Sequence, residues 1–448
     1  MDERVDAAVE DRFEDYREAL FALLRQRSVS ATGAGMDAAA ALVGELVADH
    51  GFDDWTRIET SHEPLIYAER LVGDDAPTVV FYGHYDVQPP GDDDEWETPA
   101  FEPTVRDGSI YARGAGDNKG QFAAHVFAVD ALLAAGAYPD VNVKLLFEGG
   151  EESGSLGLRE YLDGDAAEIA DADLVYVADG PVHRSGRPTL IYGNRGILTA
   201  QLDHETANTD LHSGNFGGPI PNAATEMAEV VASMVDGDEV TVEGFHDDVA
   251  ITEADRELVR EIPDDSADIM ADLDLDRLAT DEPYYERLLL EPTLTVNGLL
   301  AGYTGEGDKT IVPHEAMAKL DMRLVPDQDP DDVFERVRAH VERENPDVQV
   351  TKGTAFPPMK TPVDAPASDD VAAALADVWG VDPVEMPMLG GSLPAAYFQQ
   401  ALDPDLPVLV VPYANADQGN HSPNEHLDVE YFRNGIRATA AFLLRYGN

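Results

Sequence analysis

Two adjacent glutamates, Glu151 and Glu152, come directly after an apolar run and two glycines in VNVKLLFEGGEESGS, residues 141–155. Adjacent carboxylates repel each other, so a folded chain that holds both at the buried end of a strand needs a strong positive partner. A metal ion with an acid/base group beside it is such an arrangement. The alternative is a solvated acidic turn, and the two hypotheses differ in whether other metal-binding side chains gather nearby.

A histidine and an aspartate follow another apolar run, in TVVFYGHYDVQ, residues 78–88. His84 and Asp86 are two residues apart, so on an extended segment they point to the same side. One of them can then bind a metal while the other orients the imidazole. The alternative is a strand-end histidine beside a turn aspartate.

Three more segments place a candidate ligand after an apolar stretch. Asp117 lies in the glycine-rich YARGAGDNKGQ, Asp179 in YVADGP and His421 in GNHSPNE. A glycine-rich turn before a helix can bind phosphate, but the spacing is neither GxxxxGK[ST] nor GxGxxG, and Asp117 would repel a phosphate. Two histidines and three carboxylates instead suit zinc, with manganese or cobalt as alternatives.

The elements that must position these side chains alternate between helix and strand. The apolar spacing predicts two helices within 5–50, further helices at 120–135, 369–379 and 429–446, and strands at 65–71, 78–82, 141–147, 174–177 and 407–411. Such alternation indicates an α/β fold with a mixed, mostly parallel sheet and helices on both faces. Parallel strands end at one edge of the sheet, so the candidate ligands should meet there.

A different pattern occupies the middle of the chain. Strands are expected at 197–203, 319–324 and 348–352, with helices at 222–234 and 330–343. We therefore expect a discontinuous catalytic domain at 1–194 and 359–448, interrupted by an inserted α/β sandwich domain at 195–358. Residues 356–366 are rich in proline and read as a linker.

The combination of GHYDVQP, ARGAGDNKG, EGGEESGS and HSPNE resembles the co-catalytic two-metal hydrolases. That family includes carnosinase and cytosolic nonspecific dipeptidase, carboxypeptidase G, acetylornithine deacetylase and succinyl-diaminopimelate desuccinylase. The likeness covers nearly the whole chain and is nearest to the carnosinase-like dipeptidases, through WETPAFEPTVRDGSIYARGAGDNKG. It implies two divalent ions, with Asp117 bridging them, His84 and Asp179 completing one site, and Glu152 and His421 the other.

The resemblance also implies roles outside the ligand set. Glu151 would be the general base, Asp86 would lie behind His84, and the Asp117–Asn118 peptide would be cis. The inserted domain would be a lid that forms a homodimer, and its NTDLHSGNFGG would send His212 to the active site of the partner subunit. In KTIVPHEAMAKLDMRLVP and LGGSLP, the substrate-binding side chains would be Thr310, Arg323 and Ser392.

The expected reaction is hydrolysis of a peptide bond in dipeptides or short peptides with a free C-terminal carboxylate. Glu151 would take a proton from the attacking water, and Arg323 would bind the substrate carboxylate through its planar fork. The metal-binding motifs do not exclude an N-acyl amino acid amidohydrolase of the desuccinylase or deacetylase type. A binding protein of this fold that has lost catalysis is a remoter alternative, because every expected ligand is present.

The composition limits the partners and the surroundings. The chain has 448 residues with 88 Asp and Glu against 30 Lys and Arg, a formal charge of −58, which disfavours nucleic acid and anionic membranes. Self-repulsion of this size is screened at about 1 M salt, where the Debye length is roughly 3 Å, so a halophilic protein is expected. There are no cysteines, no signal-peptide pattern and no apolar run of membrane-spanning length, so we expect a cytoplasmic protein.

Overall fold

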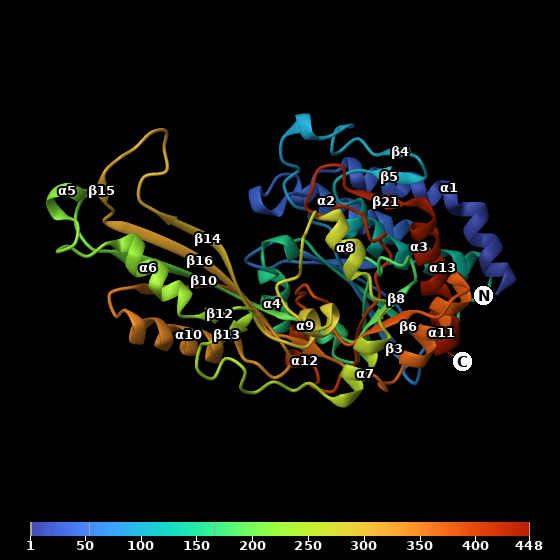
Figure 1. The fold of residues 1–448 in the computed structure, drawn as a ribbon. Coiled ribbons are helices and arrows are strands. Elements are labelled where there is room, and N and C mark those ends of the chain that lie inside the picture. The colour runs from blue at the N-terminus through green and yellow to red at the C-terminus, as the bar shows by residue number, and fades with distance from the viewer. Residues whose placement is uncertain (1, 53, 165, 448) are drawn as a thin grey trace.

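The computed structural model describes residues 2–52, 54–164 and 166–447 (Figure 1). Its largest element is a mixed eight-stranded sheet of order β1-β2-β6-β3-β7-β20-β8-β19. In chain order these strands are β1 Trp55–Ile58, β2 Leu65–Arg70, β3 Thr78–His84, β6 Asn142–Glu148, β7 Leu174–Val177, β8 Thr189–Ile191, β19 Val384–Met386 and β20 Val408–Val410. Strands β6, β3, β7 and β20 run parallel to one another, so their carboxyl ends lie at the same edge.

Helices cover both faces of this sheet, as the sequence predicted. Because successive strand residues point to opposite faces, Phe81 packs into one apolar core and Tyr82 into another. The first core is closed by α1 Glu3–Arg25, α2 Met36–Asp49, α3 Gly120–Ala134, α11 Ser368–Trp379 and α13 Val429–Tyr446. The second is closed by α4 Leu156–Leu162, α7 Glu253–Glu261, α9 Tyr284–Leu289 and α12 Ala396–Ala401.

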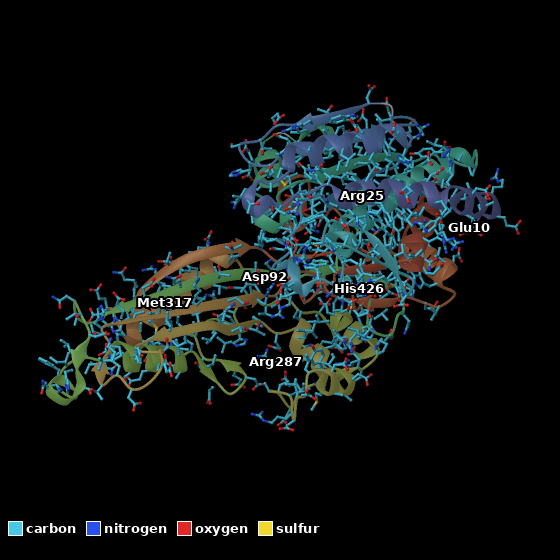
Figure 2. All side chains as sticks on the ribbon, turned by 90° about the horizontal axis from the view of Figure 1, so that it is seen from above. Glu10, Arg25, Asp92, Arg287, Met317 and His426 are labelled. Atoms are coloured by element: carbon cyan, nitrogen blue, oxygen red, sulfur yellow. The ribbon has the colours of Figure 1, made fainter. Side chains whose placement is uncertain are left out.

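A four-stranded antiparallel sheet of order β14-β16-β10-β17 forms the second part of the molecule. Its strands are β10 Gly196–Glu205, β14 Thr293–Ala301, β16 Glu315–Leu324 and β17 Gln349–Phe356. Along β10, buried and half-exposed residues alternate, because α6 Ala223–Ala232 and α10 Pro330–Glu344 cover only one face. Figures 1 and 2 both show this sheet, which carries Met317, projecting from the body that carries Arg25 and His426.

The two-domain α/β class expected from the sequence is confirmed. Part of the middle of the chain, however, packs against the large sheet. Helices α7 and α9, with α8 Ser266–Asp272 between them, belong to the segment 195–358 that the sequence pattern assigned to the inserted domain. However, Val259, Ile262 and Leu289 are buried in the second core of the large sheet. Part of this segment is therefore packed against the larger body.

The shorter elements lie in the connections. They are β4 Thr104–Arg106, β5 Ser109–Tyr111 and β21 His426–Asp428, which form a three-stranded sheet, β9 Gly193–Asn194 with β18 Met359–Lys360, β11 Leu211–His212 with β15 Ile311–Val312, β12 Val235–Asp236 with β13 Glu239–Val240, and α5 Ser213–Phe216. Within the described ranges, no helix combines the length and the apolar character needed to cross a membrane.

Candidate metal centre

The candidate ligands come from one strand end and four connections near the carboxyl edge of the large sheet. His84 is the last residue of β3, and Asp179 follows β7 by two residues. Asp117 lies in the helical turn Ala115–Lys119 that leads into α3, and Glu152 in the turn Glu151–Ser153 after β6. His421 lies between β20 and β21. Because the parallel strands end at this edge, residues far apart in the chain come together there.

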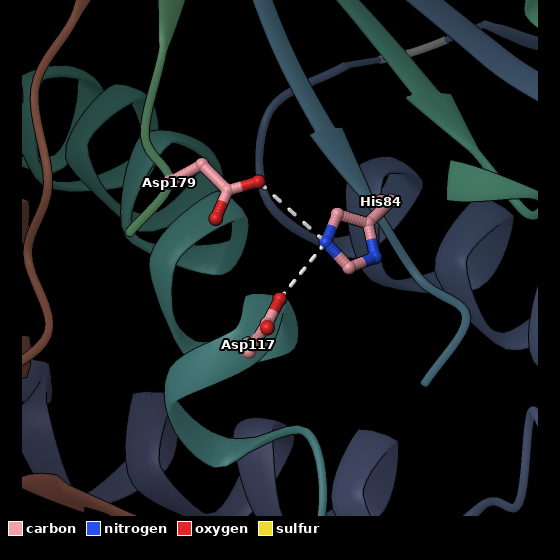
Figure 3. A group of neighbouring side chains, drawn as sticks. All are labelled: His84, Asp117 and Asp179. Carbon is pink, nitrogen blue, oxygen red and sulfur yellow. Dashed lines mark hydrogen bonds and ion pairs between the residues drawn. The ribbon is translucent and has the colours of Figure 1, made fainter. Parts of the chain in front are cut away.

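These side chains form two groups that share Asp117. In the first, His84 Nε2 lies 3.1 Å from Asp117 Oδ1 and 3.6 Å from Asp179 Oδ2 (Figure 3). In the second, His421 Nε2 lies 3.1 Å from Asp117 Oδ2 and 3.3 Å from Glu152 Oε2. Within each group, the potential ligand atoms all lie within 4.8 Å of one another. Asp117 therefore offers one carboxylate oxygen to each group, as a bridging ligand would.

The electrostatics of the two groups favour a bound cation. Hydrogen bonding to Asp117 and Glu152 raises the pKa of His421 to about 10. Burial opposes protonation of His84, yet its hydrogen bonds to Asp117, Asp179 and Asp86 raise its pKa well above the usual value. Both shifts reflect the strong negative field of the neighbouring carboxylates, which a bound cation would neutralise. Oxygen and imidazole donors in this number are a suitable set for a zinc-like divalent ion.

Glu151 lies beside the ligands and has a different environment from Glu152. Burial raises the pKa of Glu151 well above its usual value; His84 opposes this, while the negative charges of Asp179 and Glu152 add to it. A carboxylate whose pKa is raised in this way is suited to accept and pass on a proton. Among the described residues, none donates a hydrogen bond to the Glu151 carboxylate, whereas the Glu151 backbone N–H donates to Asp86.

Asp86 connects the first ligand to the glutamate pair. Its carboxylate Oδ1 lies 3.3 Å from His84 Nδ1, whose N–H also faces the Asp86 carbonyl oxygen at 3.1 Å. The backbone N–H of Glu151 donates to Asp86 Oδ1 at 3.2 Å, and that of Glu152 donates to Oδ2 at 3.1 Å. Asp86 is fully buried, so it fixes the imidazole and the turn that carries both glutamates.

The loop that carries Asp117 shows two further features. The Asp117–Asn118 peptide bond is cis, as the resemblance implied. The Asn118 side chain donates to the carbonyl oxygen of Ala178 at 2.7 Å, next to Asp179. The turn is therefore tied to the strand end that supplies the other carboxylate of the first group.

Sequence reasoning missed two side chains at this centre. Gln88 Nε2 donates to Glu152 Oε2 at 2.8 Å, and the buried Glu425 accepts hydrogen bonds from the backbone of the Asp117 loop. Both lie within motifs that drew attention for another residue, Gln88 in GHYDVQP and Glu425 in HSPNE. Gln88 lies four residues after His84, and Glu425 four residues after His421. This closeness to the candidate ligands was the only feature of the sequence that could have indicated them.

Two of the expected substrate-binding residues meet where the two sheets approach each other. Arg323 lies on the face of β16 that α6 and α10 leave uncovered, since its neighbours Met322 and Leu324 point into the core beneath those helices. Arg323 Nη1 donates to Ser392 Oγ at 3.0 Å, and Ser392 belongs to the loop between β19 and α12. A guanidinium and a hydroxyl thus face each other across the junction.

His212 and Thr310 lie together, but the structure does not bring them to the ligand groups within one chain. His212 lies in β11, which pairs with β15, and Thr310 is the residue before β15. Ser213 N donates to Thr310 O at 3.0 Å. Figure 1 shows β15 and α5 at the end of the four-stranded sheet that is far from α3 and β3. There, His212 and Thr310 line a cavity of about 470 Å³ with Lys309 and His314.

Comparisons with known proteins agree with this arrangement. The curated relatives include the Beta-Ala-His dipeptidase of Mus musculus, 30% identical over 399 residues that cover 85% of this chain and 79% of the relative. They also include the Cys-Gly metallodipeptidase DUG1 of Saccharomyces cerevisiae, 31% identical over 82% of this chain and 79% of the relative.

Solved structures extend the similarity to the whole fold. An M20 family metallo-carboxypeptidase from Sulfolobus solfataricus is 34% identical and superposes with a TM-score of 0.88 over 100% of both chains. The dipeptidase Dug1p of Saccharomyces cerevisiae is 27% identical, with a TM-score of 0.86 over 99% of this chain and 98% of the other. The model of peptidase family M20/M25/M40 matches residues 80–445. The chain therefore belongs to peptidase family M20/M25/M40 and is a metallo-hydrolase of the carnosinase-like branch.

Proposed function

We propose that the protein hydrolyses the peptide bond of dipeptides or short peptides that have a free C-terminal carboxylate. The observation that carries this proposal is the sharing of Asp117 by two ligand groups with Glu151 beside them. The relatives support the substrate class, since they include a Beta-Ala-His dipeptidase, a Cys-Gly metallodipeptidase and a metallo-carboxypeptidase. A site that selects free-ended substrates also needs a cation for the carboxylate, and Arg323 supplies one.

Two divalent ions, zinc in the first place with manganese or cobalt as alternatives, fit the donors of the two groups. The ligands would be His84, Asp117 and Asp179 for one ion, and Asp117, Glu152 and His421 for the other. When bound, such ions lower the pKa of a water molecule and polarise the substrate carbonyl. Asp86 acts through His84, because it holds the imidazole with Nε2 directed at the ligand group.

Glu151 carries the proton in this mechanism. It accepts a proton from the attacking water and later passes it to the nitrogen of the leaving amine. Arg323 and Ser392 bind the substrate carboxylate, and Thr310 of the partner subunit, which lies beside His212, contributes a further hydrogen bond to the substrate. His212 of the partner subunit donates a hydrogen bond to the oxygen that becomes negatively charged during attack.

A homodimer through the four-stranded sheet accounts for the position of His212. Its strand pair lies at the end of the lid far from the ligand groups of its own chain (Figure 1). Strand β14 is at the edge of the sheet, and Val296, Leu299 and Leu300 on it are exposed. An apolar edge strand is commonly covered by another chain. A second copy that covers it would place two lids side by side.

The test is a substrate screen combined with a Glu151→Gln variant, both in molar KCl with added zinc or manganese. We expect the wild-type protein to cleave dipeptides and to bind about two divalent ions per chain. Glu151→Gln should keep both ions and lose most turnover, whereas Glu160→Gln should behave as wild type, since Glu160 lies on α4 and, among the described residues, accepts hydrogen bonds from Ser61 alone. Cleavage of N-acetyl or N-succinyl amino acids alone would overturn the substrate class. Loss of metal from Glu151→Gln with activity retained would overturn its role.

A further inference from the structure

Glu425 is a fully buried carboxylate that lies outside the ligand set yet contacts the loop that carries Asp117. Its Oε1 accepts hydrogen bonds from the backbone N–H groups of Gly116 and Asp117, each at 3.0 Å. Its Oε2 accepts one from Gly114 N at 3.1 Å and one from Arg113 Nη1 at 2.7 Å. Both oxygens are therefore fully used, and all four donors belong to residues 113–117.

From this geometry we infer that Glu425 is a positioning residue for Asp117. It would hold the loop in the one conformation that directs Asp117 Oδ1 to the group of His84 and Oδ2 to the group of His421. The inference rests on the proposed metal-dependent function, since it concerns how the shared ligand is oriented. A metal site depends on such outer contacts because small errors in ligand orientation weaken every bond to the ion.

The sequence of the loop makes an anchor of this kind necessary. Gly114 has a positive φ of 86°, a conformation in which a side chain is strained. At Gly116, a Cβ would lie 1.9 Å from Gln418 Oε1, so any larger residue would force the Gln418 side chain to move. Glycines allow the turn but also allow many other conformations in its absence. The carboxylate of Glu425 selects one of them by binding three backbone N–H groups at once.

Glu425 also connects the loops of the two ligand groups. It lies four residues after His421, and its backbone carbonyl accepts a hydrogen bond from Ala112 N at 3.1 Å. Its partner Arg113 is almost fully buried, donates to Pro89 O at 3.3 Å and lies under the Trp96 ring. The segment 85–97 that follows His84, the loop of Asp117 and the loop of His421 are therefore held by one ion pair.

Two substitutions separate positioning from the mere presence of a negative charge. Glu425→Gln keeps the size but places an amide N–H₂ against donors. Glu425→Asp keeps the charge but shortens the side chain by about 1.5 Å, one carbon–carbon bond, so that it cannot reach all four donors. The control is Asp255→Asn, since Asp255 is also buried, pairs with Lys360 and caps α7, away from the ligand loops.

The measurement is the affinity of the purified full-length chain for Zn²⁺, by competition with a chromophoric chelator in molar KCl, beside the melting temperature of the metal-free protein. We expect both Glu425 variants to lose about 10- to 100-fold in affinity, the size found for outer contacts of metal ligands. Asp255→Asn should lower the melting temperature while it keeps the wild-type affinity.

The possible affinities of the two Glu425 variants distinguish a positioning role from a role of the charge alone. Wild-type affinity in Glu425→Asp with a loss only in Glu425→Gln would show that the charge acts, not the positioning. Wild-type affinity in both variants, with lower melting temperatures, would reduce the ion pair to a stabilising role. If Glu425→Gln does not fold, Glu425→Asp alone decides. A wild-type chain that binds no divalent ion would instead refute the proposed function, so the two failures remain distinct.

Discussion

Replacement of Asp86 by asparagine tests whether the outer contacts of His84 control the candidate centre. The Asp86 carboxylate serves three groups: His84 Nδ1 and Glu151 N at Oδ1, and Glu152 N at Oδ2. An asparagine offers a single acceptor oxygen. If that oxygen replaces Oδ1, the amide N–H₂ faces the N–H of Glu152 at the former 3.1 Å, so one donor is opposed by another.

The size of the effect follows from the loss of one hydrogen bond to a charged acceptor in a buried place. Such a bond contributes about 1.5–3 kcal/mol, and about 1.4 kcal/mol corresponds to a tenfold change. We therefore expect Asp86→Asn to lower kcat/KM for a dipeptide by about 10- to 150-fold. The affinity for Zn²⁺ should fall as well, because His84 and Glu152 both shift. The assays are steady-state kinetics in molar KCl and chelator competition.

A matched control lies at the other end of the same strand. Asp173 accepts a hydrogen bond from Thr78 N, at the start of β3, at 2.8 Å, far along the strand from His84. Asp173→Asn changes the same chemical group and should leave kcat/KM and metal affinity unchanged. Wild-type kinetics and metal binding in Asp86→Asn would refute the reasoning that Asp86 fixes the imidazole and the glutamate turn.

Three further outcomes are expected. Co-expression of His212→Ala with Glu151→Gln, each nearly inactive alone, should restore about a quarter of the wild-type activity, because half of the dimers are mixed and each has one intact site; no recovery would exclude a histidine supplied across the interface. Burial lowers the pKa of His125 to about 3. Below pH 6.5 the unfolded chain therefore takes up a proton that the folded chain does not, so the free energy of unfolding falls with the pH, by about 2 kcal/mol at about pH 5. In His125→Gln, the free energy of unfolding measured by denaturation should fall less steeply between about pH 7 and pH 5. The same pH dependence in variant and wild type would contradict this assignment. Finally, the net charge of −58 predicts a melting temperature much higher in 3 M KCl than in 0.1 M KCl, and equal melting in both would refute the halophilic hypothesis.

The elements that the sequence predicted best are the long, continuously apolar ones. The last helix, expected at 429–446, is α13 with the same bounds, and the helix expected at 120–135 is α3, Gly120–Ala134. These helices are buried on several sides, so nearly every turn carries apolar residues. Their length and continuous apolar character were therefore enough to predict where they begin and end.

The region 239–318 was not resolved into elements from the sequence, for two physical reasons. Strand β14 exposes the apolar residues Val296, Leu299 and Leu300. Its sequence therefore lacks the alternation of apolar and polar residues that marks a strand with one buried face. Helices α7 and α9 bury Val259 and Leu289 against the large sheet, a packing that depends on contacts remote in the chain. The boundaries at 195 and 358 remain predictions, as do the homodimer and the cytoplasmic location.

For the candidate site, the sequence predicted which side chains gather but not what holds them. The structure brings five candidate ligands together in two groups, His84, Asp117 and Asp179 in one and Asp117, Glu152 and His421 in the other. The contacts of Glu425 are made with backbone N–H groups about three hundred residues earlier in the chain. Every residue except proline carries such a group, so no sequence motif marks these partners.

The two ligand groups differ in their access to solvent. The His84 side chain is 1% exposed, whereas the side chain of His421 is 53% exposed and its backbone has a positive φ of 59°. Solvent therefore reaches His421 directly, whereas His84 is shielded from it. An ion held near His421 should consequently exchange faster than one held near His84. A brief shortage of metal in the surroundings would then leave a half-loaded protein that regains its second ion without refolding of the site.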